Sequence, residues 1–262
     1  LIVVITPIWL FSNTQSIKKL QINHGLSNNY IQGITQDRQG FMWFGTESGL
    51  NRFDGREFKK FYNSDIDLNT INSNELNDVY ADKFQDIIWI ATERNGLNGY
   101  NYTTHQFSFY KNDENPNSLS SNGIMFLSGE ASGNLWVTTY QSGIDMLDKK
   151  TNHFIHYNQS TVKGLISNYN RCAIDDEQGN LYIGHLFSGL SIVSIKNKTA
   201  VNYMPNPKDP NSLPSKEVYT VFIDSKKRIW VGTNNGLALF HPEKKIFTVF
   251  RKNMNPGSLR SN

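Results

Sequence analysis

The sequence of 262 residues has one cysteine, Cys172, so no disulfide can form within it. A catalytic thiol needs an activating base, and the motif NRCAIDD around Cys172 supplies none, so we expect this side chain to point inward from a strand. Charge is also scarce, since charged residues make up 19% of the chain and the net charge is only +3, with lysine and arginine scattered. This composition argues against nucleic acid as a partner.

Long apolar runs are missing except at the N-terminus, where residues 1–11 read LIVVITPIWLF and the polar stretch SNTQS follows. The run is too short to span a bilayer and has the length of a signal-peptide core. We therefore expect residues 1–14 to be a truncated signal peptide, with an uncleaved membrane anchor as the alternative. Export is the favoured interpretation.

Helical periodicity is absent as well, because no run of ten or more residues keeps apolar side chains at spacings of three and four. Aromatic residues are abundant instead, at 13% of the chain. An aromatic anchor followed by a Gly-Thr-like pair and a Gly-Leu pair recurs at Trp43, Trp89, Trp136, Tyr182 and Trp230, with separations of 46, 47, 46 and 48 residues. A period in the forties predicts a repeat architecture.

Within each repeat, short runs alternate between apolar and polar residues, as strands do. In the first repeat they cover residues 30–36, 41–46, 49–53 and 57–62. Four strands in a repeat of this length predict an all-β fold of β-propeller blades, forming an open arc or part of a seven-bladed ring. A closed five-bladed ring is the alternative. We expect the blades at about residues 26–72, 73–119, 120–165, 166–213 and 214–257, with 258–262 beginning a sixth.

Several residue types recur at fixed places in the repeat, and we expect them to be structural. The anchoring tryptophans should pack between blades. A leucine in each polar connector should do the same; these are Leu26, Leu119, Leu165 and Leu213. Glycines should open the third strand, where a tight turn excludes a Cβ; these are Gly49, Gly96, Gly143, Gly189 and Gly236. Acidic residues should accept backbone N–H groups in the first turn; these are Asp37, Asp82, Glu130, Asp176 and Asp224.

The phrase GLSNNYIQGITQDRQGFMWFGTESGLNRFDG, at residues 25–55, closely resembles the two-component regulator propeller repeat. The resemblance extends from about residue 24 to the end, with departures such as Tyr182 in place of tryptophan and His185 in place of threonine. It implies the periplasmic sensor region of a Bacteroidetes-type hybrid two-component system, in which propellers precede a membrane helix, a histidine kinase and a DNA-binding output domain. Such receptors are associated with sensing oligosaccharides and switching on polysaccharide-utilisation genes.

The loops between the second and third strands vary where the rest of the repeat is fixed, as expected of a recognition surface. Propellers bind ligands at such loops and at the inner-strand entrances. The candidate ligand-binding residues are Arg94, Asn95, Tyr140, Gln141, His185, Phe187 and Asn234. The alternative is that these loop tips contact solvent alone.

No catalytic residue, metal site or cofactor is predicted. Acidic residues outside the turns, such as Glu75 and Asp78, single out no catalytic pair. His153 and His156 lack further zinc ligands at suitable spacing, so we expect them on the surface. We expect a non-catalytic sensor segment, for which the resemblance implies an oligosaccharide as the ligand of the full receptor and we expect a second copy as partner. A secreted propeller lyase or glycoside hydrolase is the alternative.

Overall fold

The structure, a computed structural model, describes residues 19–255 and 258–261. These residues form five four-stranded antiparallel sheets and a short 3-10 helix, η1 (Ile22–His24). In each sheet the strands lie side by side in chain order. An all-β propeller fold, as the repeats predict, is confirmed.

We number the sheets as blades in chain order. Blade 1 contains β1 (Ile31–Gln36), β2 (Met42–Thr46), β3 (Gly49–Phe53) and β4 (Phe58–Phe61). Blade 2 contains β5 (Leu76–Ala81), β6 (Ile87–Thr92), β7 (Leu97–Asn101) and β8 (Gln106–Tyr110). Blade 3 contains β9 (Ile124–Gly129), β10 (Leu135–Thr139), β11 (Ile144–Asp148) and β12 (His153–Tyr157). Blade 4 contains β13 (Asn170–Asp175), β14 (Asn180–His185), β15 (Leu190–Ser194) and β16 (Thr199–Tyr203). Blade 5 contains β17 (Val218–Ile223), β18 (Ile229–Thr233), β19 (Gly236–His241) and β20 (Ile246–Phe250).

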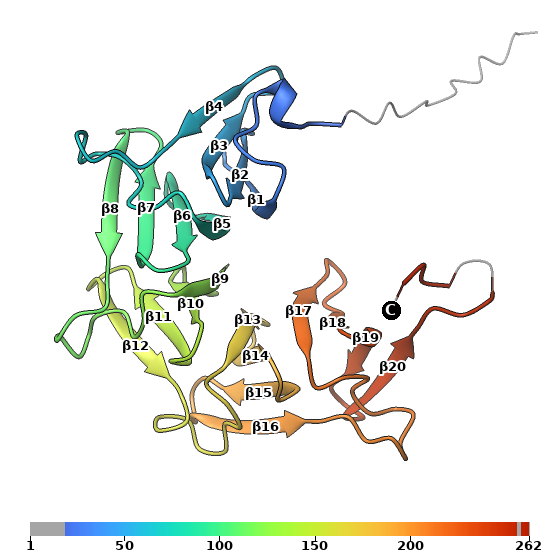
Figure 1. Ribbon diagram of the computed structural model, residues 1–262. Helices are drawn as coiled ribbons and strands as arrows, with labels where there is room; N and C mark the ends of the chain where they lie inside the picture. The colour runs from blue at the N-terminus through green and yellow to red at the C-terminus, as the bar shows by residue number, and fades with distance from the viewer. Residues whose placement is uncertain (1–18, 256–257, 262) are drawn as a thin grey trace, which may run out of the picture.

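The blades form an open arc around a central channel (Figure 1). The first strand of every blade faces the centre, and the fourth strand lies at the periphery. Successive inner strands are in contact from β1 to β17, whereas blade 5 and blade 1 stand apart across a gap. The five blades thus form an open arc, as predicted, and not a closed five-bladed ring.

Apolar packing occurs between neighbouring blades rather than in one shared core. Trp43 and Leu50 of blade 1, for example, pack with Val79 and Tyr100 of blade 2 in one buried cluster. Trp43, Trp89 and Trp136 are at most 2% exposed. The connector leucines are buried as predicted, at 5% exposure or less. Each blade is therefore stabilised mainly by its neighbours, as in other repeat proteins.

The acidic turn residues accept backbone N–H groups, as predicted, and three of them have a second role. One oxygen of Asp37 accepts the N–H groups of Gln39 and Phe41, and the other accepts the indole N–H of Trp43 at 2.7 Å. Asp82 and Asp224 hold Trp89 and Trp230 in the same way. Trp136 bonds instead to Asp175 of blade 4, at 3.1 Å. In blades 1, 2 and 5 the turn carboxylate thus fixes both the turn and the tryptophan.

The glycines that open the third strand have the strained geometry that the pattern predicts. Gly96 has φ of +83°, and a Cβ at this position would lie 2.2 Å from the carbonyl oxygen of Tyr110 on the outer strand. The preceding threonine fastens the same turn, because the Thr92 hydroxyl donates to the carbonyl of Gly96 and accepts from the N–H of Asn95. These hydrogen bonds fix the position of the variable loop relative to the second and third strands.

The predicted signal peptide or anchor, residues 1–14, lies outside the described residues. Among the described residues, no helix is long and apolar enough to cross a membrane.

Candidate ligand-binding site

Every inner strand carries a β-bulge at its second residue, close to the loop end of the channel. The pairing register skips one residue between Leu76 and Asp78, for example, and the same shift recurs in the other four blades. The bulged residues are Gln32, Asn77, Met125, Arg171 and Tyr219. Bulges leave a residue unpaired and redirect its side chain. Two amides, a thioether, a guanidinium and a phenol are thus presented at equivalent positions of one rim.

The variable loops are fixed to the entrances of the inner strands by backbone hydrogen bonds. The N–H of Glu93 donates to the carbonyl of Glu75 at 3.1 Å, and that of Tyr140 donates to Gly123 at 3.0 Å. Blades 4 and 5 repeat the bond between Leu186 and Tyr169 and between Asn234 and Glu217. The side chains at this face are therefore presented on a preorganised backbone, which lowers the entropic cost of binding.

A cavity of about 600 Å³ lies at this face between blades 2 and 3. It is lined by Asn77, Glu93, Arg94, Ser121, Gly123, Met125, Tyr140, Gln141 and Ser142. A second cavity of about 260 Å³ lies between blades 1 and 2, and Gln32, Glu47, Glu75, Leu76, Asn77 and Glu93 line it. The two cavities share Asn77 and Glu93 and are therefore adjacent, and we refer to the two together as the rim groove. Its size suits a small ligand.

Three of the predicted binding residues, Arg94, Tyr140 and Gln141, line the rim groove together. Tyr140 is 42% exposed, and the Arg94 guanidinium lies 3.3 Å from the Glu93 carboxylate. Asn95 is adjacent, but its side chain donates to the carbonyl of Asn72 and so fixes the connector. Their chemistry, an aromatic face beside amide and charged groups, suits stacking and hydrogen bonding to a sugar.

The other three predicted residues lie on blades 4 and 5, away from the rim groove. His185 is a correction: it is fully buried, where its ring nitrogens bond to Asn170 at 2.7 Å and Ser191 at 2.6 Å. Burial lowers the pKa of His185 to about 4, and the residue fills the buried position of the turn threonine. Phe187 is 57% exposed, and Asn234 accepts a hydrogen bond from Tyr219.

The bulged residues Asn77 and Met125 were missed by the sequence reasoning, because a bulge inserts one residue that the strand pattern does not reveal. A signal was present in blade 2, where the adjacent polar residues Asn77 and Asp78 interrupt the alternation. Asn77 donates to the carbonyl of Ile124 at 2.9 Å and so joins blade 2 to blade 3 beside the cavity.

At the opposite, turn-bearing end of the channel, a further cavity of about 380 Å³ includes Asp78 in its lining. Burial raises the pKa of Asp78 to about 7. Its two oxygens accept the N–H groups of Val79 and Leu127, at 2.8 and 2.9 Å. The carboxyl group thus joins adjacent blades, and this engagement argues against a role as a catalytic acid.

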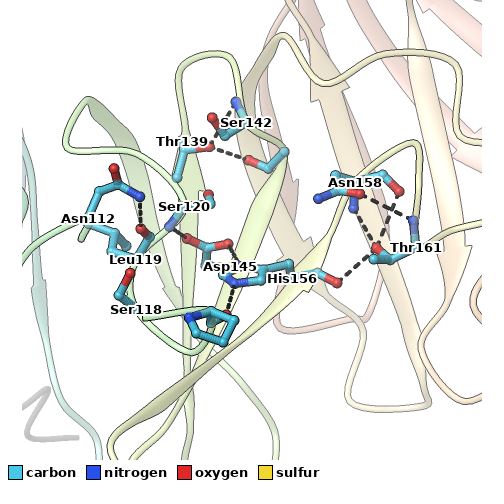
Figure 2. Close-up of polar contacts among 12 residues, drawn as sticks. Asn112, Ser118, Leu119, Ser120, Thr139, Ser142, Asp145, His156, Asn158 and Thr161 are labelled. Atoms are coloured by element: carbon cyan, nitrogen blue, oxygen red, sulfur yellow. Dashed lines mark hydrogen bonds and ion pairs between the residues drawn. The ribbon is translucent and has the colours of Figure 1, made fainter. Parts of the chain in front are cut away.

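His153 is exposed, as predicted, whereas His156 is half-buried against a buried carboxylate of blade 3, which corrects the expectation for that residue (Figure 2). Asp145 has no exposed surface and lies 2.7 Å from His156, while its other oxygen accepts the N–H of Ser120 at 2.7 Å. The second ring nitrogen of His156, Nε2, lies within hydrogen-bonding distance of the carbonyl oxygen of Pro116, at 2.9 Å. Asn51 and Asn98 occupy the equivalent position in blades 1 and 2 and hold Ser27 and Asn72. In all three blades a third-strand side chain accepts a backbone N–H of the preceding connector, and we call this contact the connector latch. Blade 3 differs because its latch is a carboxylate paired with a histidine.

Two further features concern metal binding and thiol chemistry. Within residues 19–255 and 258–261, no group of three or more His, Cys, Asp or Glu side chains is placed to hold a metal ion. Cys172 is buried at the inward strand position that was predicted, and burial raises the pKa of its thiol to about 11. Such a thiol is unreactive near neutral pH.

These features define an arc of β-propeller blades with a groove at its loop face. Residues 25–48 and 212–235 match the family described as "Two component regulator propeller". Histidine kinase P4 of Formosa agariphila is 27% identical over 157 residues, which are 58% of this chain and 11% of that protein. Two segments of the chain are thus similar to this propeller family, and the resemblance predicted from the sequence is confirmed.

Solved structures of extracellular domains are similar to this chain in fold. The extracellular domain of the hybrid two-component system BT3049 from B. thetaiotaomicron is 43% identical, with a TM-score of 0.82 over 90% of this chain and 32% of that one. The extracellular domain of the one-component system BT4673 from the same organism is 22% identical, with a TM-score of 0.74 over 91% of this chain and 33% of that one, and this likeness shows the fold alone. The chain spans about a third of the length of these domains.

Proposed function

We propose that this chain is the N-terminal part of the ligand-sensing region of a hybrid two-component histidine kinase and response regulator. It is exported to the periplasmic side of the inner membrane, and the full-length protein is anchored in that membrane and acts as a homodimer. The ligand is an oligosaccharide, and its binding controls polysaccharide-utilisation genes. The chain itself carries out no catalysis.

One observation carries this proposal. In a chain 43% identical to the extracellular domain of a hybrid two-component system, side chains from two separate loops converge on one cavity of about 600 Å³. Tyr140 offers an exposed ring, and Gln141, Asn77 and Ser142 offer hydrogen-bonding groups beside it. Few polar groups around an aromatic surface, on a fixed backbone, are what a binding site for a small polar ligand requires.

The test is titration calorimetry of the chain with panels of oligosaccharides prepared from several polysaccharides. Tyr140→Ala should weaken binding about tenfold or more, because the stacking surface is lost. Phe109→Ala is the matched control, since Phe109 is also 42% exposed but lies on the outer strand β8. Equal losses in both variants would argue against the rim groove as the site, and release of cleaved products would favour the lyase or hydrolase alternative.

A further inference from the structure

We infer that the rim groove selects uncharged oligosaccharides and discriminates against those bearing carboxylate or sulfate groups. This inference rests on the proposed function, because it assigns a ligand class to the same site. Neither the repeat pattern nor the net charge of the chain predicts this selectivity: the chain as a whole carries a charge of +3, which by itself favours acidic ligands.

The groove has the opposite local charge. Glu47, Glu75 and Glu93 line it, and the basic side chain in its lining is Arg94. The Arg94 guanidinium lies 3.3 Å from the Glu93 carboxylate, so its charge is already matched within the groove. Three carboxylates against one guanidinium leave two negative charges without a counter-charge in the lining. An acidic sugar entering here would meet like charge.

These carboxylates are positioned to accept hydrogen bonds from hydroxyl groups. Glu93 and Glu75 are joined by a backbone hydrogen bond, which fixes the separation of their main chains. Glu47 accepts from the Gln32 amide at 3.0 Å and retains further acceptor capacity. An ionised carboxylate is an acceptor with no proton to donate, whereas a neutral sugar offers many hydroxyl donors. The acidic end of the groove therefore complements an uncharged sugar.

The other end of the groove supplies contact area. Tyr140 and Met125 line the cavity between blades 2 and 3 beside Gln141 and Ser142. A ring and a thioether provide apolar surface for a sugar face, and the amide and hydroxyl groups suit its edges. One oligosaccharide lying along the groove would thus donate hydroxyl protons at blades 1 and 2 and stack at blade 3.

The experiment uses matched probes of equal length and linkage: glucan with glucuronan oligosaccharides, and mannan with mannuronan oligosaccharides. Titration calorimetry at low ionic strength should show the neutral member binding about tenfold or more tightly, because each like charge close to a groove carboxylate weakens binding by that order. Added salt should narrow the gap, since the Debye length falls to about 10 Å at 0.1 M.

A double variant, Glu75→Gln with Glu93→Gln, removes the excess negative charge and leaves Arg94 unmatched. It should strengthen binding of the acidic member several-fold and remove most of the discrimination, whereas Glu114→Gln on an exposed connector should change neither. Equal or tighter binding of acidic probes by the unmodified chain would overturn the charge selectivity and leave the proposed function intact. If no probe of any pair binds, both the selectivity and the proposed function are overturned.

Discussion

Blades 2 and 5 have the same strand pattern but different surroundings. Trp89 of blade 2 is 2% exposed, whereas Trp230 of blade 5 is only half-buried and the neighbouring Phe222 is 58% exposed. Blade 2 has a neighbour on each side, while blade 5 presents one face with an open cavity of about 370 Å³ lined by Thr220, Phe222, Asp224, Trp230, Gly232 and Leu237.

The glycine after the second-strand aromatic shows the same difference at atomic scale. A Cβ at Gly45 would lie 2.9 Å from Val79 of the next blade, and at Gly184 it would lie 2.7 Å both from Val218 of the next blade and from Cys172 of its own blade. At Gly232 the nearest atom is in Thr220 of the same blade, at 2.9 Å. The burial of a repeat residue is thus set by the neighbouring blade as much as by its own sequence, as expected where interfaces carry the stability.

The largest contrast should come from truncating the two tryptophans. Trp89→Ala should lower the free energy of unfolding by about 3–5 kcal/mol, because it leaves a cavity between two blades and removes the indole N–H bonded to Asp82. Trp230→Ala should cost only about 1–2 kcal/mol, since that ring is partly solvated. Urea denaturation followed by circular dichroism measures both. Equal losses would mean that the open face of blade 5 is covered in solution.

A smaller effect should follow from Gly96→Ala. Its positive φ and the close approach to the carbonyl of Tyr110 should together cost about 2–3 kcal/mol. The control is Gly55→Ala, where φ is +96° and nothing lies within 4 Å of a new Cβ, so only the backbone term of about 1 kcal/mol remains. Thermal and urea denaturation of the two variants separates the cost of backbone strain, which both share, from the cost of the steric clash with Tyr110, which only Gly96→Ala has. A loss at Gly96 no greater than that at Gly55 would show that the outer strand moves to accommodate the methyl group.

The connector latch distinguishes blade 3 from blade 2 by its pH dependence. The hydrogen bond that the His156 ring donates to the Asp145 carboxylate raises the pKa of His156 above its ordinary value near 6.5. The charged latch therefore contributes fully to the free energy of unfolding below the ordinary pKa of histidine, and this contribution is lost as the pH rises through the raised pKa. Asp145→Asn introduces the residue that blade 2 has as Asn98, without the charge.

The stability difference between the unmodified chain and Asp145→Asn should fall by about 1 kcal/mol between pH 6 and pH 9, a modest figure because solvent reaches one side of the imidazole. Urea denaturation across this range measures the slope, and Asn98→Ala provides a latch variant in which the slope of the unmodified chain is retained. A difference that stays constant with pH would mean that His156 is not charged in the folded chain.

Repetition explains why the fold was predictable and the candidate site only partly so. The strands and the glycines of the third strand recur five times and the connector leucines four times, so each position is supported by its copies. His185 misled the prediction because it replaces a threonine in a turn, and the sequence does not show that Asn170 and Ser191 surround it. The bulged residues were missed because a bulge disturbs the alternation on which strand prediction depends.

The smallest effect should come from the ion pairs at the turn-bearing end of the channel. Glu177 of blade 4 lies 2.6 Å from Lys227 of blade 5 and 3.8 Å from Lys83 of blade 2. Lys227 lowers the pKa of Glu177. Any contribution of these ion pairs to the stability of the fold is therefore present near neutral pH and is lost as the carboxylate is protonated in acid. About half of the Glu177 side chain is exposed, however, whereas Lys149 and Asp82 form a pair between blades 2 and 3 that is 11% and 1% exposed.

Glu177→Gln should therefore leave the urea midpoint within experimental error at 0.15 M salt, because water and ions screen exposed pairs. The same measurement at 0.01 M salt should show a small loss, since screening is then weaker. A clear loss at both salt concentrations would show that the pairs at Glu177 hold blade 2 against blades 4 and 5 across the channel. In that case the arc would be braced at the turn-bearing end as well as by the contacts between neighbouring blades.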